Sequence, residues 1–321
     1  MLENLLLLFD NPIGLLNLIV DGIMIGAVFA LIAYGMALIW GVMNIINLSQ
    51  GEFVIFGGFI AYYTSNQWTL PIGPAGNAWY TIEWSGISPL WALIIAPMVL
   101  FAVGRLFYAL VIFRIIERDM FTSILATFGI SILLSQAMNG VFSAEDIIAQ
   151  HDFDSWVVIS SSSGDLVVEQ VRLIALIFAL IVGALLAVYL KRTRSGQAIR
   201  AVAQNARAAR IMGIDADRVY ARTYALNAAI CGAAGVLVAM ILTIHAFAGL
   251  IYTVRSFMLV IIAGLGNVTG VIVAGLGLGA AEKLAEFILG TSFQVAFVTG
   301  LLIAVLLVRA MRLRRERKAL S

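Results

Sequence analysis

The sequence predicts an all-α fold, a polytopic transmembrane helical bundle, and three observations carry this prediction. Of the 321 residues, 62% are hydrophobic and 12% are charged, whereas about a quarter of the residues of a soluble domain are charged. The mean hydropathy is +1.02. Apolar runs of the length that a bilayer requires, about 20 residues, recur throughout the chain. Several membrane helices therefore explain the apolar excess better than one large soluble core does.

Eight apolar segments are candidate membrane spans, and residues 1–321 are predicted to form a single transmembrane domain with eight to ten crossings. The segments are residues 13–40, 45–64, 89–113, 121–142, 172–190, 220–244, 256–281 and 293–309. The N-terminus, Met1-Leu2-Glu3, lacks the basic region that opens a cleaved signal peptide. We therefore expect the first segment to remain in the mature protein.

Charge assigns the loops to the two sides of the membrane, because cytosolic loops are rich in Lys and Arg. Loop 191–222 has eight basic residues against two acidic ones and is predicted to be cytosolic, as is the basic tail at 309–318. Loop 143–171 has six acidic residues and no Lys or Arg and is predicted to be external. Loop 65–88 carries three tryptophans, which we expect to lie at the external membrane interface.

These sides conflict with the count of segments. Loop 191–222 and the basic tail should lie on the same side of the membrane, but only three apolar segments separate them, and three crossings would place them on opposite sides. We therefore expect that segment 256–281 is not a single membrane helix. It contains six glycines, each of which disfavours a helix interior by about 1 kcal/mol, and we predict a break near Gly264–Gly270. Unwound backbone at membrane depth needs protein or a water-filled cavity to satisfy it, so the break indicates a translocation path. Close helix packing through Gly266-x-x-x-Gly270 and Gly275-x-x-x-Gly279 is the alternative, and both can hold.

A weak internal repeat relates residues 13–142 to residues 220–309. In each half an apolar helix precedes a polar, glycine-rich break and then a helix of small residues, at 47–58 and at 264–277. Paired interruptions of this kind are typical of the binding regions of transporters. The predicted path residues are Asn47, Ser49, Gln50, Gly51, Glu52, Thr127, Ser131, Gly264, Gly266 and Asn267.

Two of these features have a second interpretation. Glu52 lies beside the break at Gly51, where its carboxylate would contact a substrate, but it would equally well reach the membrane interface or cap the helix that follows. The four hydroxyl residues of segment 121–142 recur every four positions and form one helical stripe. Such a stripe lines a path or packs two helices together. The stripe consists of Ser123, Thr127, Ser131 and Ser135.

Loop 191–222 contains a predicted amphipathic helix that begins at Ser195 as N-cap and ends at Gly213. Its apolar positions follow helical spacing, with three arginines on an adjoining side. A basic helix of this kind would lie on anionic lipid or enter a groove of another protein. Its many alanines favour the groove, because a helix that lies on lipid usually carries bulky apolar residues. The apolar positions are Ile199, Val202, Ala203, Ala206 and Ala209.

Several classes of enzyme are excluded by absent residues. The single cysteine, Cys231, cannot form an intrachain disulfide, and His151 and His245 are far apart in the sequence, so a metal site is not expected. The sequence has no Gly-Lys-Ser/Thr of a P-loop and no zinc-protease or serine-hydrolase motif. We therefore expect neither a catalytic site nor a cofactor, and any ATP hydrolysis must belong to another subunit.

At loop 191–222 the chain resembles the permease subunits of branched-chain amino-acid ABC importers. The resemblance is carried by Ser195-Gly196-Gln197-Ala198-Ile199-Arg200-Ala201 and by Ala209-Arg210-Ile211-Met212-Gly213-Ile214-Asp215, and it extends to Ala30–Gly35, Ile46–Phe53, Gly232–Leu237 and Ile262–Gly266. In that family this loop holds the coupling helix, which docks in a cleft of the ATP-binding subunit. The resemblance implies that the docking residues are Ser195, Gly196, Arg200, Ala201, Asn205, Ala209, Met212, Gly213 and Asp215.

The resemblance also implies the setting in which the chain works. It implies a second, homologous permease subunit, two ATP-binding cassette subunits and an extracytoplasmic solute-binding protein, in the cytoplasmic membrane of a bacterium or archaeon. It implies no cofactor and no nucleic-acid partner.

The sequence departs from the family's pattern at the first break. Gln50 stands where the family usually has histidine, and Ser49 replaces a typical alanine. These departures leave the solute open, and urea or short amides remain candidates beside amino acids. A secondary transporter driven by an ion gradient through a buried carboxylate such as Glu52 is the alternative class.

Overall fold

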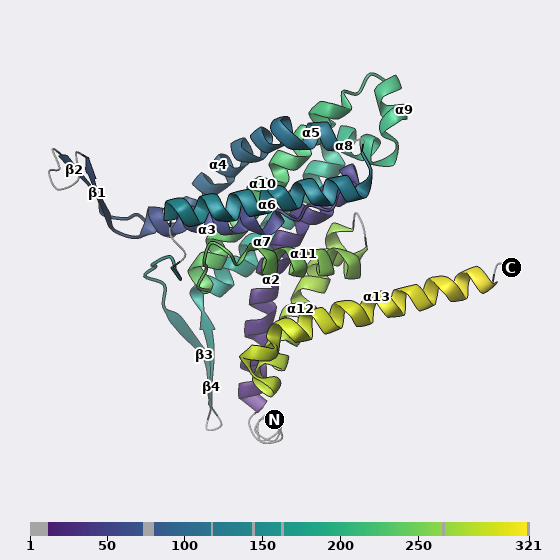
Figure 1. Cartoon of the computed structure of the whole chain (residues 1–321). Coiled ribbons are helices and arrows are strands. Elements are labelled where there is room, and N and C mark those ends of the chain that lie inside the picture. The colour runs from purple at the N-terminus through teal and green to yellow at the C-terminus, as the bar shows by residue number, and fades with distance from the viewer. Residues whose placement is uncertain are drawn as a thin grey trace. The chain divides into compact units, whose positions relative to one another are not determined.

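The computed structural model describes residues 12–72, 80–116, 118–142, 145–161, 164–264 and 267–319. The chain packs as two compact units, each built from separate stretches of sequence. The first unit comprises Met1–Ala33, Asp154–Gly183 and Val254–Ser321, and the second comprises Tyr34–Phe153 and Ala184–Thr253. Figure 1 shows the helices of both units by their labels.

Helices account for most of the chain, and their bounds follow the predicted apolar segments closely. The long helices are α2 (Pro12–Met43), α3 (Gln50–Ser65), α4 (Ala92–Phe107), α6 (Met120–Phe142), α7 (Gln170–Arg192), α10 (Ala216–Ile241), α11 (Gly249–Ala263), α12 (Val268–Leu289) and α13 (Gln294–Ala319). Among the described residues, five helical stretches are long and apolar enough to cross a membrane. They are Pro12–Met43, Pro89–Ile115, Met120–Phe142, Gln170–Arg192 and Ala216–Ile241. The predicted polytopic helical bundle is confirmed.

The stretch Pro89–Ile115 is one continuous span made of four pieces. A 3-10 turn, η1 (Pro89–Trp91), starts with proline, which lacks the N–H that the first turn of a helix leaves unused. It leads into α4, a π-helical turn η2 (Tyr108–Ile112) and the short α5 (Phe113–Ile115). Two further short helices, α8 (Arg194–Gln204) and α9 (Ala206–Ile211), lie in loop 191–222.

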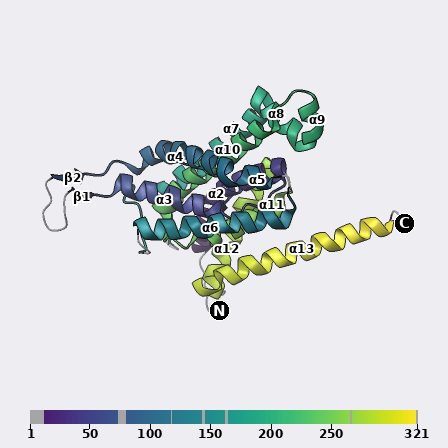
Figure 2. The same cartoon turned by 45° about the horizontal axis from the view of Figure 1, so that its top comes forward.

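Two β-hairpins interrupt the helical architecture, and the sequence patterns did not predict them. In loop 65–88, β1 (Trp68–Ile72) pairs with β2 (Tyr80–Trp84), and the rings of Trp68 and Trp84 stack with centroids 6.2 Å apart. The hairpin extends beyond the end of α3 (Figure 2). Trp79 lies outside the described residues. The cross-strand tryptophan pair supplies the local contact that stabilises these short strands.

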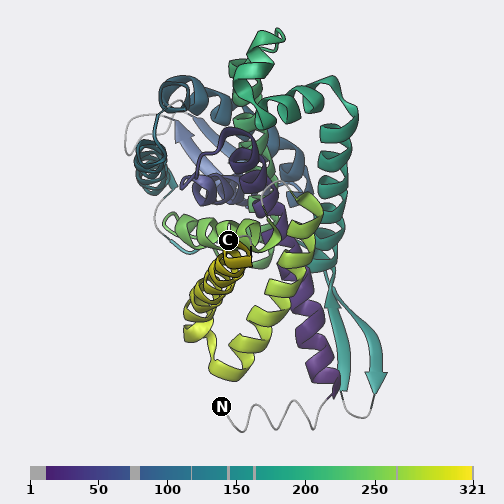
Figure 3. The ribbon, with the colours of Figure 1, turned by 90° about the vertical axis from the view of Figure 1, so that its right-hand side faces the viewer.

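The second hairpin lies in loop 143–171 and leads into α7 (Figure 3). It pairs β3 (Ser155–Ser161) with β4 (Gly164–Glu169). Asn17 of α2 anchors it, because the Asn17 side-chain amide donates to the Asp165 carbonyl at 2.7 Å and accepts from the Val167 N–H at 3.0 Å. The long-range bonds to Asn17 explain why local periodicity could not predict this hairpin.

In the first unit, α2 and α12 pack through glycines. A Cβ atom on Gly22 would lie 2.6 Å from the Ala280 Cα, and one on Gly275 would lie 2.6 Å from the Ala30 Cβ. Only residues without a side chain allow helix backbones to approach this closely. The expected packing role of Gly275 is therefore confirmed.

The predicted break in segment 256–281 is also confirmed. Helix α11 ends at Ala263, and Gly264 adopts φ +86°, a left-handed conformation that favours glycine. Asn267 then caps α12, with its side-chain oxygen accepting from the Gly270 N–H at 3.0 Å. Gly266 lies outside the described residues. The apolar run is therefore two helices, α11 and α12.

In the second unit, α10 lies alongside both α3 and α4 and forms the core (Figures 1 and 2). Small residues again set the distance, because a Cβ on Gly57 would lie 2.7 Å from the Gly232 Cα and one on Gly104 would lie 2.6 Å from the Ala228 Cβ. Most residues of α10 are buried, including polar Thr223, Tyr224 and Asn227. These polar residues are part of the candidate site.

Candidate translocation site and cytosolic coupling surface

The candidate site surrounds the junction between α2 and α3, where the backbone leaves the helical path. Residue Asn44 takes φ +53°, a conformation that asparagine tolerates better than most residues do. The residues that follow, up to Ser49, are not helical. Three of these residues, Ile45, Asn47 and Ser49, are buried, so backbone groups of the segment need partners from elsewhere.

Two threonine hydroxyls supply these partners. Thr127 of α6 accepts from the Leu48 N–H at 3.2 Å and lies 3.1 Å from the Ile46 carbonyl, to which it can donate. Thr253 of α11 accepts from the Gly51 N–H at 2.8 Å and lies 3.2 Å from the Leu48 carbonyl. Side chains from α6 and α11 thus replace lost helical hydrogen bonds and stabilise the non-helical backbone of the junction.

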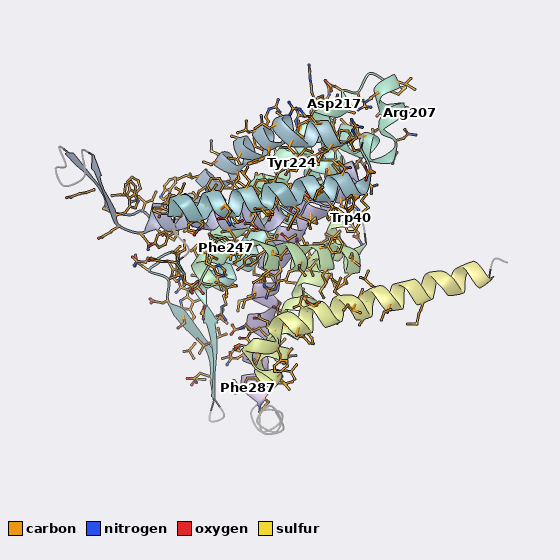
Figure 4. All side chains as sticks on the ribbon, viewed as in Figure 1. Trp40, Arg207, Asp217, Tyr224, Phe247 and Phe287 are labelled. Atoms are coloured by element: carbon orange, nitrogen blue, oxygen red, sulfur yellow. The ribbon has the colours of Figure 1, made fainter. Side chains whose placement is uncertain are left out.

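Three polar side chains at the end of the junction, those of Asn47, Ser49 and Gln50, are fully buried. The Ser49 hydroxyl donates to the Asn47 side-chain oxygen at 2.7 Å and lies 3.4 Å from the Tyr224 hydroxyl. The side-chain amide of Gln50 donates to the Cys231 sulfur at 3.0 Å. Cys231 in turn lies 3.6 Å from the side-chain oxygen of Asn227. Tyr224, labelled in Figure 4, lies among the helices of the second unit.

Glu52 is 4% exposed and begins the first turn of α3. The Ser131 hydroxyl donates to its Oε1 at 2.9 Å. Gly249 faces the carboxyl group, and a Cβ there would lie 2.6 Å from Oε2. Within the described ranges, no lysine, arginine or histidine forms an ion pair with Glu52. A buried carboxyl without a cationic partner is a functional candidate by default.

Three atoms of this region are buried without a hydrogen-bond partner among the described residues: Asn47 Nδ2, Glu52 Oε2 and Asn227 Nδ2. Leaving a buried polar group unsatisfied costs about 1–3 kcal/mol. Native proteins rarely accept this cost unless water, an ion or a ligand satisfies the group during function. These three atoms are therefore candidates for contact with water, an ion or a ligand.

Seven predicted path residues meet at this junction. They are Asn47, Ser49, Gln50, Gly51, Glu52, Thr127 and Ser131. The other two described ones, Gly264 and Asn267, lie at the α11–α12 break of the first unit. All four stripe residues of α6 face inward, since Ser123, Thr127 and Ser135 are buried and Ser131 bonds Glu52.

Sequence reasoning missed the contributions of α10 and α11 to the site. Tyr224, Asn227 and Cys231 recur at helical spacing on an otherwise apolar α10, a pattern that could have indicated an inward polar face. Thr253 and Gly249 gave no such signal, because single Thr and Gly residues are common in membrane helices. We refer to these five residues with the seven at the junction as the polar cluster.

Loop 191–222 holds two helices, not the single helix predicted from Ser195 to Gly213. Thr193, not Ser195, is the N-cap of α8, and its hydroxyl accepts from the Gly196 N–H at 2.9 Å. Ser195 instead bonds the Arg222 guanidinium. Asn205 interrupts the helix, because its side chain accepts from the Ala208 N–H at 2.9 Å and caps α9. A capping side chain competes with the helix backbone for hydrogen bonds. The alanine-rich pattern around Asn205 gave no sign of this interruption.

The described loop residues divide into buried and exposed ones. Ile199, Val202 and Ala209 are buried, whereas Ala203 is exposed and Ala206 is half-buried, so the predicted apolar face is only partly covered. Gly196 is buried so tightly that a Cβ would lie 2.6 Å from the Leu190 Cα.

At the end of α9 the loop presents apolar side chains to the surroundings. Ile211 and Met212 are each 81% exposed. Gly213, at φ +83°, ends the helix, and Asp215 caps α10 by accepting from the Arg218 N–H at 3.0 Å. Arg207 is exposed on α9 (Figure 4). Two large exposed apolar residues on a basic loop form a surface suited to another protein.

Comparison with known proteins gives relatives along nearly the whole chain. The high-affinity branched-chain amino acid transport system permease protein LivH of Escherichia coli strain K12 is 27% identical over 295 residues, which cover 90% of this chain and 91% of that protein. The corresponding protein BraD of Pseudomonas aeruginosa is 25% identical over 301 residues, covering 92% and 94%. A probable LivH of Methanocaldococcus jannaschii is 26% identical over 308 residues, covering 92% and 89%.

No solved structure gives a significant match. The model of the family described as the branched-chain amino acid transport system permease component matches residues 18–306, from α2 to α13. The matched range includes the α2–α3 junction, the α11–α12 break and both short helices, α8 and α9, of loop 191–222. This chain therefore belongs to the family of branched-chain amino acid transport system permease components.

Proposed function

We propose that the chain is the transmembrane permease subunit of an ATP-driven, binding-protein-dependent importer of branched-chain or related amino acids. The observation that carries the proposal is a helix break in the polar cluster, in a chain that matches the permease family from residue 18 to residue 306. The chain itself is a transport subunit rather than an enzyme, and it lies in the cytoplasmic membrane as a multi-pass protein.

The polar cluster is the part of the translocation path that we assign. An amino acid zwitterion exposes one carboxylate and one ammonium group, and both need polar partners in transit. The unsatisfied Asn47, Glu52 and Asn227 atoms supply donors and an acceptor of the required kinds. Gly264, Gly266 and Asn267 form the second part of the proposed path, at the break that corresponds to the first one in the internal repeat.

Coupling to ATP is assigned to the cytosolic loop. The proposed docking residues are Ser195, Gly196, Arg200, Ala201, Asn205, Ala209, Met212, Gly213 and Asp215. Of these, Met212 and Arg200 are exposed and available for contact, while Asn205, Gly213 and Asp215 shape the loop through caps and a left-handed turn. Ile211, which is also exposed and adjoins Met212, belongs to the same proposed docking surface.

The proposed assembly contains two permease subunits, two ATP-binding cassette subunits and an extracytoplasmic binding protein. Each ATP-binding subunit receives one cytosolic loop, so two permeases are required. A second, homologous permease forms the pair. The binding protein delivers the solute to the external face.

The test is uptake into proteoliposomes that contain the reconstituted complex, with a panel of leucine, isoleucine, valine, other amino acids, urea and short amides. ATP inside or an imposed ion gradient serves as the alternative energy source. The proposal predicts ATP-dependent uptake of branched-chain amino acids that requires the binding protein. Gradient-driven uptake without ATP would show that the protein is a secondary transporter and not part of an ATP-driven importer. ATP-driven uptake of urea alone would support the importer but show that its substrate is urea.

A further inference from the structure

A polar cavity of the second unit lies at the end that the charge pattern predicts to be cytosolic, and it is lined by none of the proposed path residues. It measures about 410 Å³ and is lined by Phe113, Arg114, Ile116, Arg118, Arg210 and Asp217. These residues come from α5, the turn after it, α9 and the start of α10. We call it the arginine pocket.

The pocket carries an excess of positive charge. Arg210 is matched by Asp217, with Nη2 and Oδ1 3.3 Å apart. Arg114 donates to the Leu110 carbonyl at the end of the π-helical turn, which positions its guanidinium at the helix C-terminus. Among the residues that the structure describes, neither Arg114 nor Arg118 forms an ion pair with a carboxylate.

The carboxylate that follows Arg118 in the sequence is already engaged. Asp119 accepts from the Thr122 hydroxyl at 2.6 Å and from the Thr122 N–H at 3.2 Å. It therefore caps α6 and is not among the residues that line the pocket. The one carboxylate that lines the described pocket, Asp217, is paired with Arg210, so the guanidinium groups of Arg114 and Arg118 have no carboxylate partner in the described part of the chain, an arrangement suited to an external anion.

The residues around the pocket indicate which anion would bind. Guanidinium groups match the geometry of phosphate oxygens through paired N–H donors. The pocket lies where the span Pro89–Ile115 ends and the span Met120–Phe142 begins. At this point Phe113 is 52% exposed and Phe121 is 72% exposed. Exposed aromatic side chains at the end of a membrane helix are suited to acyl chains and the headgroup region.

We propose that the arginine pocket binds the phosphate group of an anionic phospholipid from the cytosolic leaflet, with Arg114 and Arg118 on the phosphate and Phe113 and Ile116 against the glycerol and upper acyl chain. Basic pockets between membrane helices on the cytosolic side are suited to such headgroups. The lipid would lie between the span that ends at α5 and the loop that carries α9, and so beside the proposed docking surface.

The experiment is native mass spectrometry of the full chain in detergent, titrated with phosphatidylglycerol or phosphatidylcholine of equal chain length. The pocket variant combines Arg114→Gln and Arg118→Gln. The matched control combines Arg192→Gln and Arg207→Gln, which removes the same charge from exposed arginines of loop 191–222 that do not line the pocket. Because Arg114 also caps a helix, Arg118→Gln alone is the second variant.

The wild-type chain should retain phosphatidylglycerol in preference to phosphatidylcholine, and the control should behave like the wild type. The pocket variant should lose affinity for phosphatidylglycerol by about tenfold, as expected for the loss of charge-assisted hydrogen bonds, and Arg118→Gln alone should show part of this loss. Equal loss in the pocket variant and the control would overturn the proposal, since net charge alone would then explain binding.

Two further arms separate the lipid from other anions. If inorganic phosphate at equal concentration binds the chain and displaces phosphatidylglycerol, the pocket takes free phosphate and the lipid assignment is wrong. If the co-purified complex with ATP-binding subunits has lost the lipid that the isolated chain retains, the pocket belongs to the subunit contact and the lipid assignment is again wrong. Retention of the lipid in both arms supports it.

Discussion

At the scale of single residues, the polar cluster is organised by hydroxyl groups that hold a broken helix. Thr253 is the clearest case, because one hydroxyl contacts both the Gly51 N–H and the Leu48 carbonyl. The sequence predicted the residues of the junction itself, since polar and glycine residues are conspicuous in an apolar run. It could not predict Thr253, which is distant in sequence and is placed by tertiary packing alone.

Replacing Thr253 by valine keeps the side-chain shape and removes the hydroxyl. The Gly51 N–H would then be buried without a partner, which should lower the free energy of unfolding by about 1–3 kcal/mol. Thermal unfolding in detergent measures this loss. Thr64→Val is the matched control, because the Thr64 hydroxyl bonds only carbonyls of its own helix, and equal melting temperatures for the two variants would contradict the role given to Thr253.

Gly249 tests the packing around Glu52. Adding a methyl group in Gly249→Ala would bring it against the Glu52 carboxyl, and overpacking of this kind costs about 1–3 kcal/mol. Gly277→Ala is the control, since nothing lies within 4 Å of a Cβ there. Stability and uptake should fall in Gly249→Ala and stay near wild type in Gly277→Ala. A second substitution, Glu52→Ala, should restore part of the lost stability, and no restoration would argue that the clash lies elsewhere.

At the scale of elements, hydropathy located the membrane helices well, because length and apolarity are local properties. The glycine content of 256–281 also predicted the division into α11 and α12. The N-cap residues of the helices were harder to predict. Ser195 was predicted as an N-cap, but Thr193 and Asn205 perform this function and divide the loop into α8 and α9. Several neighbouring residues of this loop are capable of capping a helix, so the local sequence alone did not decide which of them is used.

Asp119 offers a test of such a cap. Hydrogen bonds from the Thr122 side chain and backbone hold the pKa of Asp119 below its ordinary value. A carboxyl whose folded-state pKa is depressed stabilises the fold above its unfolded pKa, and this contribution disappears as the pH falls through the folded value. We expect the Thr122 amide to exchange faster as the pH is lowered through the acidic range, after correction for intrinsic exchange rates.

The matched variant is Asp119→Asn, which keeps an acceptor oxygen for the cap and cannot titrate. Its corrected exchange rate at Thr122 should not change with pH over the same range. Hydrogen exchange followed by mass spectrometry measures both proteins. Identical pH profiles for wild type and Asp119→Asn would mean that the cap is not controlled by the charge of Asp119.

The end of α9 tests the docking surface. Ile211 is 81% exposed, so Ile211→Asp should leave the fold intact and place a charge in the proposed contact with the ATP-binding subunit. Co-purification of that subunit and ATP-dependent uptake should both fall at least tenfold, because burying an unpaired charge in an interface costs several kcal/mol. Gln204→Asp, also exposed and at the end of α8, is the control. Normal association of the Ile211→Asp variant with the ATP-binding subunit would show that Ile211 is not part of the interface.

At the scale of the whole molecule, composition and charge gave the class of protein, and the sequence resemblance gave the family. The division into two compact units built from separate stretches was not visible in the sequence, because it depends on which distant helices pack together. The polar cluster shows the same limit. Local pattern identified the α2–α3 junction, whereas packing supplied Tyr224, Asn227 and Thr253 from helices nearly 200 residues away in sequence.

The central claim is that solute passes the polar cluster during ATP-driven transport. The chain has a single cysteine, so Cys231→Ser gives a background in which one new cysteine can be followed. Ser49→Cys places a thiol in the cluster, and Ala37→Cys places one at a buried apolar position of α2. A methanethiosulfonate reagent reports water-accessible thiols in the reconstituted complex.

If solute passes the polar cluster, Cys at position 49 should be modified during ATP turnover, and saturating transported solute should slow the modification. Cys at position 37 should stay unmodified. If Cys at position 49 resists modification in every state while the same complex transports solute, the path does not pass the polar cluster and the claim is wrong.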